Sequence, residues 1–408
     1  METIKKLGKE TLIYIKPFFI WIALAIVMGI LGGVLGAVFH KCLEIVTDVR
    51  SHNSLIILML PLAGVLITAI YRAFRSEGKL NTNRILEAAD SGERVPIVLA
   101  PLIFGGTVIT HLFGGSAGRE GAALQLGGSI GYNIGRILKL NKSDLRIIVM
   151  AGMSSFFSSM FGAPLTAAIF ALEVVRVGYV HHYGFMPCIL SAVIAYEISQ
   201  RLGTSGVRFD VLIPEITSSL VIKIIILGVL CALVSILFCV AIKRTSVLLH
   251  KLFHNTYLRT ITGAIALVVF TVLLRTTDYN GAGMEVIARA MGGEAHPLAF
   301  LIKIIFTAIT IAAGFKGGEI VPTLFIGATF GCMAGNFIGL DAGFSASIGF
   351  VALFCGVTNC PLASIALALE VFGADGILIY AIVCAVSFMT SGNFSLYTSQ
   401  KILFSKIS

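Results

Sequence analysis

Long apolar runs without charged side chains constrain this chain more than any other feature. No residue from Phe18 to Phe39 is charged, and a similar run, interrupted by one lysine, starts near residue 219. A helix needs about 20 mostly apolar residues to cross a bilayer, so each run is long enough to span one. Charged residues make up only 12% of the 408 residues, about half the share in a soluble domain. The sequence therefore predicts an all-α, polytopic membrane protein and excludes a soluble globule.

The basic residues lie in the gaps between these runs and give the chain a net charge of +9. In a soluble protein this surplus would suggest a nucleic-acid partner, but lysine and arginine beside membrane spans mark loops that stay in the cytosol. We therefore expect no nucleic-acid partner, and a protein of the cell (plasma or inner) membrane with both termini in the cytosol. The residues behind this expectation are Lys5, Lys6, Lys9, Lys243, Arg244, Lys401 and Lys406.

The eight cysteines include no CxxC pair, and five of them lie within apolar runs. Cysteines in such places are typical of small buried hydrophobic side chains. We therefore expect no disulfide framework, no metal site and no cofactor.

Two segments of the chain occur twice, in the same order. The segment from Gly114 matches the one from Gly314 at six positions with a constant offset of 200. The segment APLTAAIFALEV, ending at Val174, matches CPLASIALALEV, ending at Val371. Chance could produce one such match, but two in order indicate an internal duplication.

This duplication predicts two transmembrane halves, residues 18–200 and 218–398, joined by a connector at residues 201–217. Residues 1–17 and 399–408 are the expected cytosolic ends. The first run is too long for the core of a signal peptide, so we expect it to be a retained helix. Within each half, glycine clusters interrupt the apolar runs at corresponding places, which points to a transport site near the bilayer midplane.

Arg119 and Glu120 are the only charged residues between Arg94 and Arg136. An ionisable residue at membrane depth is a functional candidate; the alternative is a structural Arg–Glu pair, which the divergence of adjacent helical side chains disfavours. Gly118 and Gly121 flank the pair and expose N–H groups at the start of the following helix, where anions bind. We expect Glu120 to occupy the anion site, and to leave it when protonated, so that one residue gates the anion and carries a proton.

The second half repeats this form in GGEIVP. We expect a helix to start at Pro322, because proline favours the first helical position, and the N–H groups of Ile320 and Val321 to point at the same centre. Glu319 is a second carboxylate at membrane depth and a candidate proton-handling residue; the alternative is a paired or solvated loop residue.

Two further residues lie beside helix ends. Asn81 precedes a predicted helix, where asparagine is a usual N-cap, and Tyr397 lies in a polar segment after a span, where an interfacial aromatic residue is common. Gly114, Ser116 and Gly118 also fit the GxSxG pattern of hydrolases, with His111 nearby. That pattern requires a strand before the serine, whereas the flanks here are apolar helix, so we do not expect an enzyme.

Taken together, GREG at Gly118–Gly121, GGxxxP at Gly317–Pro322, the PL…LEV segments and the late Tyr397 resemble the CLC family of chloride channels and anion/proton antiporters. The resemblance covers the whole transmembrane region. It implies a homodimer with one pore per subunit, each pore built from two inverted halves of short, tilted and broken helices.

The resemblance also implies residue roles. Glu120 matches the gating glutamate, Tyr397 the tyrosine of the inner anion site, and Ile320 and Val321 the residues whose amides face the anion. Asn81 stands where chloride-transporting members have the serine of GSGIP.

At several positions the chain differs from the pattern of the chloride-transporting members and is similar to the fluoride/proton antiporter branch. The proline after GREG is replaced by Ala122, the internal proton-transfer glutamate by Val174, and GGE carries Glu319. That branch often has threonine before the proline; here Val321 is there and Thr323 follows.

We therefore expect a secondary active transporter that exports fluoride in exchange for protons, with a chloride/proton antiporter or a chloride channel of the same fold as the alternative. Fluoride is strongly hydrated, so its site needs good hydrogen-bond donors, which an amide and a phenol supply without a metal. The candidate anion-binding residues are Asn81, Gly118, Arg119, Gly121, Ile320, Val321, Thr323 and Tyr397.

Overall fold

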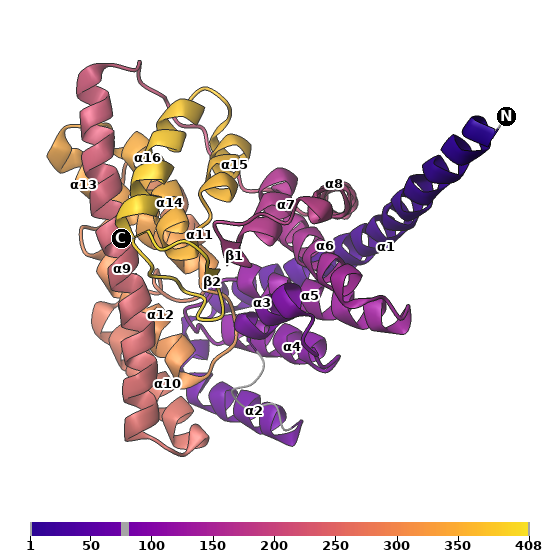
Figure 1. Cartoon of the computed structure of the whole chain (residues 1–408). Helices are drawn as coiled ribbons and strands as arrows, with labels where there is room; N and C mark the ends of the chain where they lie inside the picture. Colours follow the sequence, from indigo (N-terminus) through magenta and orange to yellow (C-terminus); the bar gives the residue numbers. More distant parts are fainter. Residues whose placement is uncertain (1, 75–80, 407–408) are drawn as a thin grey trace.

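The computed structural model describes residues 2–74 and 81–406, and of residues 2–14 the backbone alone. The side chains of Lys5, Lys6 and Lys9, expected on the cytosolic side, lie outside the described residues. The described chain is almost entirely helical (Figure 1). This confirms the predicted all-α membrane fold.

The first eight helices belong to the N-terminal part of the chain. They are α1 (Glu2–His52), α2 (Leu60–Ala73), α3 (Thr82–Ser91), α4 (Leu99–Leu112), α5 (Glu120–Ile137), α6 (Lys142–Phe161), α7 (Pro164–Glu173) and α8 (Phe185–Arg201). Short 3-10 turns lie at Ser54–Met59 and His182–Gly184.

Eight helices follow after residues 202–217, which are not helical. They are α9 (Ser218–Leu252), α10 (Thr256–Leu274), α11 (Met284–Met291), α12 (Ala299–Ala313), α13 (Ile320–Ile338), α14 (Ala342–Thr358), α15 (Pro361–Phe372) and α16 (Ile377–Thr390). Two-residue strands β1 (Arg176–Val177) and β2 (Lys401–Ile402) pair in parallel.

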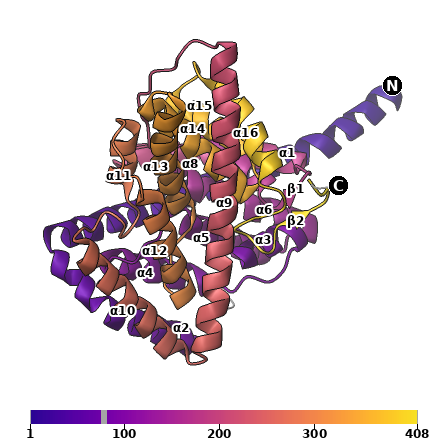
Figure 2. The same ribbon diagram turned by 90° about the vertical axis from the view of Figure 1, so that its left-hand side faces the viewer.

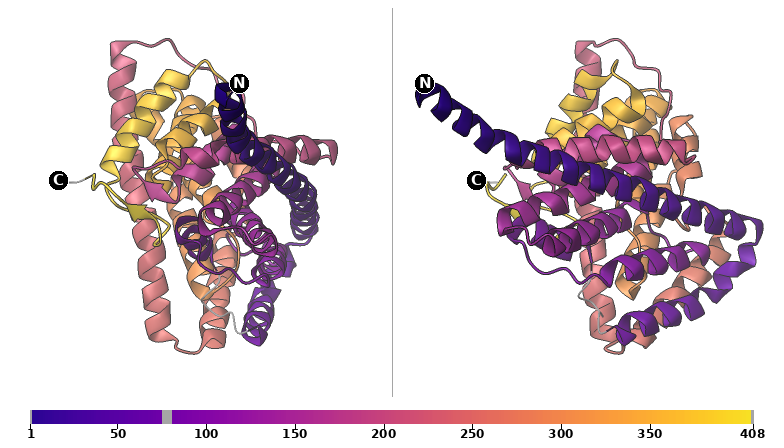
Figure 3. Two further views of the ribbon diagram at one scale, coloured as in Figure 1. Left: turned by 45° about the vertical axis from the view of Figure 1, so that its right-hand side comes forward. Right: turned by 90° about the vertical axis from the view of Figure 1, so that its right-hand side faces the viewer.

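Within the described residues, five helical segments are long and apolar enough to cross a membrane: Ile15–His52, Ser54–Ala73, Ser218–Leu252, Thr256–Leu274 and Ile320–Ile338. Other apolar helices, such as α7 and α15, are too short to cross alone. The long α9 runs along one side of the molecule, with α2 and α10 packed together near its end (Figure 2). In Figure 2 the N-terminal end of α1 and strand β2 both lie to the right of α9. In the right panel of Figure 3 the N-terminal end of α1 and the yellow C-terminal segment both lie at the left.

Glycines make the same helix contact in both parts of the chain. A Cβ atom on Gly127 of α5 would lie 2.0 Å from the carbonyl oxygen of Gly152 in α6. A Cβ atom on Gly327 of α13 would lie 2.3 Å from the carbonyl oxygen of Gly349 in α14. These glycines therefore allow the two helices of each pair to pack closely.

The repeated helices α7 and α15 cap each other. The carboxylate of Glu173, at the end of α7, accepts N–H groups of residues 362–363 at 3.2 and 2.9 Å. The carboxylate of Glu370 in α15 accepts N–H groups of residues 165–166, both at 2.8 Å. Because each carboxylate satisfies the free N–H groups of the other helix start, the two parts of the chain contact each other through equivalent residues.

Candidate functional site

The loops that precede α5 and α13 meet in the interior. Gly118 donates its N–H to the carbonyl of Gly318 at 2.7 Å, and Gly318 donates back to Gly118 at 2.8 Å. A Cβ atom on Gly121 would lie 2.6 Å from the Cα atom of Gly318. The glycines around Glu120 therefore allow the start of one helix to touch the start of the other.

Backbone N–H groups of both helix starts lie at this contact. The nitrogen of Val321 is 3.1 Å from the point where Gly118 would carry a Cβ, and that of Gly121 is 2.4 Å from the same point on Gly318. N–H groups in the first turn have no partner within their helix and favour anions. The structure thus brings together Gly118, Gly121 and Val321, with Ile320 as the first residue of α13.

The start of α13 differs from the prediction. The helix begins at Ile320 and not at Pro322, which is its third residue. Proline is tolerated there because its missing N–H would have no partner in the first turn. In α7 and α15 the first residue is indeed proline.

Glu120 is fully enclosed at the first position of α5. Its carboxylate accepts the backbone N–H of Arg119 at 3.1 Å and the Arg119 Nε at 3.3 Å. Arg119 and Glu120 therefore pair, contrary to the expectation that adjacent side chains diverge, because Arg119 is the N-cap and not a helical residue. The guanidinium of Arg119 lies in turn 3.5 Å from the ring of His40.

Glu319 is the N-cap of α13, one position earlier than Glu120 in the repeated pattern. Its Oε2 atom is buried and has no hydrogen-bond partner among the described residues. That atom lies 3.7 Å from the point where Gly121 would carry a Cβ. Glu319 therefore places an unpaired carboxylate oxygen beside the contact between the two helix starts.

Two cavities approach this contact and share no lining residue. The first, the Arg119 cavity, has a volume of about 680 Å³ and is lined by Arg119, His40 and the end of α1. The second, the Tyr397 cavity, has a volume of about 460 Å³ and is lined by Glu319, Tyr397 and residues of α2, α9 and α10. Glu120 is buried and lines neither cavity; it contacts Arg119 of the first, and the next residue, Gly121, lies beside Glu319 of the second.

The predicted residues divide between these places. Asn81, Glu319 and Tyr397 line the same cavity, although they are far apart in the sequence. The Tyr397 hydroxyl is buried and has no partner among the described residues. Thr323 lines neither cavity, and its hydroxyl donates to the carbonyl of Glu319 at 2.8 Å.

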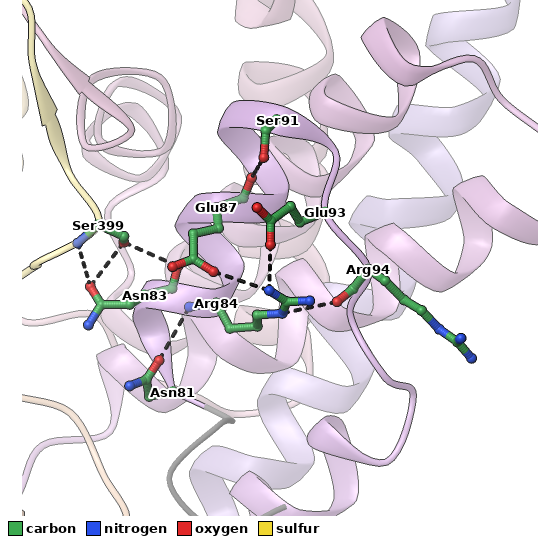
Figure 4. A network of polar contacts seen from close by, with 8 residues as sticks. All are labelled: Asn81, Asn83, Arg84, Glu87, Ser91, Glu93, Arg94 and Ser399. Carbon is green, nitrogen blue, oxygen red and sulfur yellow. Dashed lines mark hydrogen bonds and ion pairs between the residues drawn. The ribbon is translucent and has the colours of Figure 1, made fainter.

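Asn81 is the N-cap of α3, as predicted. Its Oδ1 atom accepts the N–H of Arg84 at 3.3 Å (Figure 4). Because only the oxygen can accept an N–H, the cap leaves the –NH₂ end of Asn81 as a donor. The cap interpretation and the anion-donor interpretation are therefore compatible.

The segment that carries Tyr397 is fixed from several sides. The Ser399 hydroxyl donates to Asn83 Oδ1 at 3.0 Å (Figure 4), and the Gln400 amide donates to the carbonyl of Val174 at 2.9 Å. Asp90 of α3 pairs with Arg176 of β1 and, at 2.7 Å, with Lys401 of β2. Burial alone would raise the pKa of Asp90, but hydrogen bonds from these two cations hold it below its ordinary value. These contacts hold the segment of Tyr397 in place, so that Tyr397 lines the cavity.

Three residues that line the cavities beside the predicted site residues were not predicted from the sequence. Lys316 and Tyr71 line the Tyr397 cavity, and His40 lines the other beside Arg119. Lys316 could have been found from the sequence, because it is an ionisable residue three positions before Glu319 in an apolar region, and such a residue is a functional candidate. Tyr71 and His40 lie in ordinary apolar helices, and no sequence pattern distinguishes them.

Ser116 is not arranged as a nucleophile. Its hydroxyl is buried against the Thr307 hydroxyl at 3.0 Å, and His111 Nδ1 is bonded to the carbonyl of Thr107 at 2.9 Å. No strand precedes Ser116 in residues 81–116. The hydrolase alternative therefore lacks the geometry that its motif requires.

The eight cysteines are free thiols. Within residues 15–74 and 81–406, no group of three or more His, Cys, Asp and Glu side chains is arranged to hold a metal ion.

Two solved structures share this architecture. The chain superimposes on the crystal structure of a CLC-type fluoride/proton antiporter with a TM-score of 0.90 and 31% identity, over 94% of this chain and 98% of that one. It also superimposes on a slow cyanobacterial Cl⁻/H⁺ antiporter with a TM-score of 0.79, over 91% of this chain and 94% of that one, and at 20% identity this shows the fold alone.

Sequence comparisons agree. The chain is 33% identical to the chloride/fluoride channel protein of Pseudomonas syringae pv. tomato, over 95% of this chain and 87% of that protein. It is 27% identical to the H(+)/Cl(-) exchange transporter ClcA of Vibrio parahaemolyticus, over 87% of this chain and 82% of that protein. The family model described as voltage gated chloride channel matches residues 63–392. The chain therefore belongs to the voltage-gated chloride channel family, the CLC proteins.

Proposed function

We propose that this protein is a fluoride/proton antiporter that exports fluoride from the cell. One observation carries the proposal: two helix starts meet between two cavities, and each brings a carboxylate to the contact. Unpaired N–H groups of helix starts bind anions, and a carboxylate that competes for such a site can exchange a proton for an anion.

Glu120 is the gating residue in this proposal. When charged, it stays on the N–H and guanidinium of Arg119 at the start of α5. When it is protonated, its attraction to Arg119 falls, and the freed N–H groups accept the anion. Glu319 takes the proton onward, because its unpaired oxygen lies near Gly121 and borders the Tyr397 cavity.

We propose that the Tyr397 cavity opens to the cytosol. Lys243 and Arg259 line it, and basic loops stay on the cytosolic side of a membrane. The Arg119 cavity is lined by the carboxylates of Glu44, Asp48, Asp278 and Glu285 as well as by Arg50, Arg119 and Arg208. Its carboxylates suit an entrance for protons, so that anions enter through the Tyr397 cavity and protons through the Arg119 cavity.

The proposed preference for fluoride rests on the hydrogen-bond donors of the cavity and on the similarity to a fluoride/proton antiporter. Fluoride needs strong donors in place of its water, and the cavity offers the Asn81 amide and the Tyr397 hydroxyl. Structural similarity to a CLC-type fluoride/proton antiporter supports the same substrate.

The assembly is proposed from the resemblance to the family. We propose a homodimer in the cell membrane, with one pore per subunit, both termini cytosolic, and two halves at residues 18–200 and 218–398. The bridge between Gly118 and Gly318 lies within a single chain, which supports one complete pore per subunit.

Efflux from proteoliposomes tests the proposal. The protein is reconstituted into vesicles loaded with fluoride or with chloride, and ion-selective electrodes follow each anion together with external pH. We expect fast fluoride efflux with proton uptake and little chloride movement. Chloride efflux at an equal or greater rate would instead assign the chain to the chloride-transporting CLC proteins.

A further inference from the structure

The Tyr397 cavity contains more unsatisfied polar atoms than the proposed cycle uses. Four buried atoms that border it have no hydrogen-bond partner among the described residues: Tyr71 OH, Gln125 Oε1, Glu319 Oε2 and Tyr397 OH. A buried polar group without a partner costs free energy, so such groups indicate an unseen ligand or water. Tyr71 stands out because it is a donor on α2 with no role in the cycle above.

A lysine stands beside Tyr71. The Nζ atom of Lys316 lies 4.2 Å from the centre of the Tyr71 ring. The stem of Lys316 packs on Gly106 of α4, where a Cβ atom would lie 2.8 Å from its Cγ. Its backbone N–H is held by the Thr110 hydroxyl at 3.1 Å. The position of Lys316 is therefore fixed by contacts with two helices, α2 and α4.

Nothing in the described chain neutralises this cation. None of the ion pairs among residues 15–74 and 81–406 includes Lys316. A ring face attracts an ammonium group but leaves its N–H donors unused. The other cations of the cavity, Lys243 and Arg259, add to the positive potential, and Glu319 is the carboxylate that borders it.

We propose that Lys316 and Tyr71 form a halide-binding position in the Tyr397 cavity. The Lys316 ammonium supplies charge and the Tyr71 hydroxyl a second donor, so that a small anion is held before it reaches Glu319 and Tyr397. This inference rests on the proposed function for the direction of transport, but the position would bind whichever halide the protein carries.

Saturation of efflux tests the position. In proteoliposomes, Lys316→Met is expected to raise the KM for fluoride about tenfold and to change kcat by less than about twofold, because a charge near the path acts on entry. Lys316→Arg keeps the charge and restores most of the affinity. Tyr71→Phe keeps the ring and removes only the donor, so its KM rises about threefold, as expected for one neutral hydrogen bond. Titration calorimetry of the intact protein with sodium fluoride should count one anion fewer per chain in Lys316→Met.

Lys223→Met is the matched control, because Lys223 bonds the carbonyl of Gly339 at 2.9 Å and borders neither cavity. Its KM should equal that of the wild type. An unchanged KM and anion count in Lys316→Met would overturn the proposal. Equal losses in Lys316→Met and Lys316→Arg, with lower melting temperatures in both, would also overturn it and make Lys316 a support of the loop.

The two proposals fail in different ways. A wild-type protein that moves chloride and not fluoride would end the fluoride assignment, yet the Lys316 variants would still raise the KM for chloride. A wild-type protein that exports fluoride while its Lys316 variants match it would end this inference alone.

Discussion

The two repeated loops place their carboxylates differently, although their backbones pair with each other. In the first, Glu120 begins α5 and is enclosed, with Arg119 as its partner. In the second, Glu319 is the residue before α13 and has a carboxylate oxygen without a partner among the described residues. A shift of one position thus gives one paired and one unpaired carboxylate at the same contact.

This difference makes the two sides of a duplicated site chemically distinct. Glu120 contacts Arg119, which lines the Arg119 cavity, and Glu319 lines the Tyr397 cavity. Two identical loops would give a symmetrical site without direction. The shifted carboxylates, together with Arg119 on one side alone, make the two sides chemically distinct.

The largest effect is expected from Glu120→Gln. Glutamine keeps the shape of the side chain but can neither be charged nor carry a proton, so fluoride efflux should proceed with no proton uptake. Measurement of pH and fluoride in the same vesicles checks this. Glu197→Gln, at an exposed position of α8, is the control. Full coupled transport in Glu120→Gln would remove Glu120 from the proposed cycle.

A smaller effect is expected from Glu319→Gln. If Glu319 passes the proton toward the Tyr397 cavity, its loss should lower the coupled rate about a hundredfold, the lower end of the contribution of one proton-transfer group. Anion binding, measured by calorimetry, should change little. A rate equal to the wild type would make Glu319 a structural N-cap, and a complete loss of coupling would make the two carboxylates one relay.

Next in size is Gly121→Ala, which tests the contact between the loops themselves. The added Cβ would lie 2.6 Å from the Cα of Gly318, and overpacking of this kind costs about 1–3 kcal/mol. We expect a lower melting temperature and slower efflux. Gly105→Ala is the matched control in α4, because a Cβ there meets nothing within 4 Å. Equal behaviour of the two variants would show that the loops can separate without cost.

The sequence predicted the features whose signal is local. Hydropathy and the glycines around Glu120 and Glu319 are read within a few neighbouring residues, and the duplication repeats such a local pattern 200 residues later. These signals indicated the fold class and the two helix starts. The end of the first helix was missed, because α1 continues past the charged residues after Phe39 to His52. Glu44 and Asp48 lie in this last part of α1 and line the Arg119 cavity. Their charge interrupts the apolar run but does not end the helix.

The rest of the site depends on tertiary packing. Tyr71 and Lys316 meet because α2 and α4 pack against each other and Gly106 leaves room for the lysine stem. The pairing of Arg119 with Glu120 depends on the helix beginning one residue after Arg119. No periodic pattern in the sequence indicates either contact, so neither could be predicted before the packing of the helices was known.

The smallest effect is expected from Asn81→Ala, and it separates capping from anion binding. Loss of the N-cap costs about 1 kcal/mol of stability, and the same cost should follow Asn141→Ala, which removes the N-cap of α6 away from both cavities. If the –NH₂ group of Asn81 also serves the anion, only Asn81→Ala should weaken the preference for fluoride over chloride, measured as the ratio of the two efflux rates. Equal ratios in both variants would leave Asn81 as a cap alone. The selectivity would then rest on Tyr397, which lines the Tyr397 cavity, and on the N–H groups of the two helix starts.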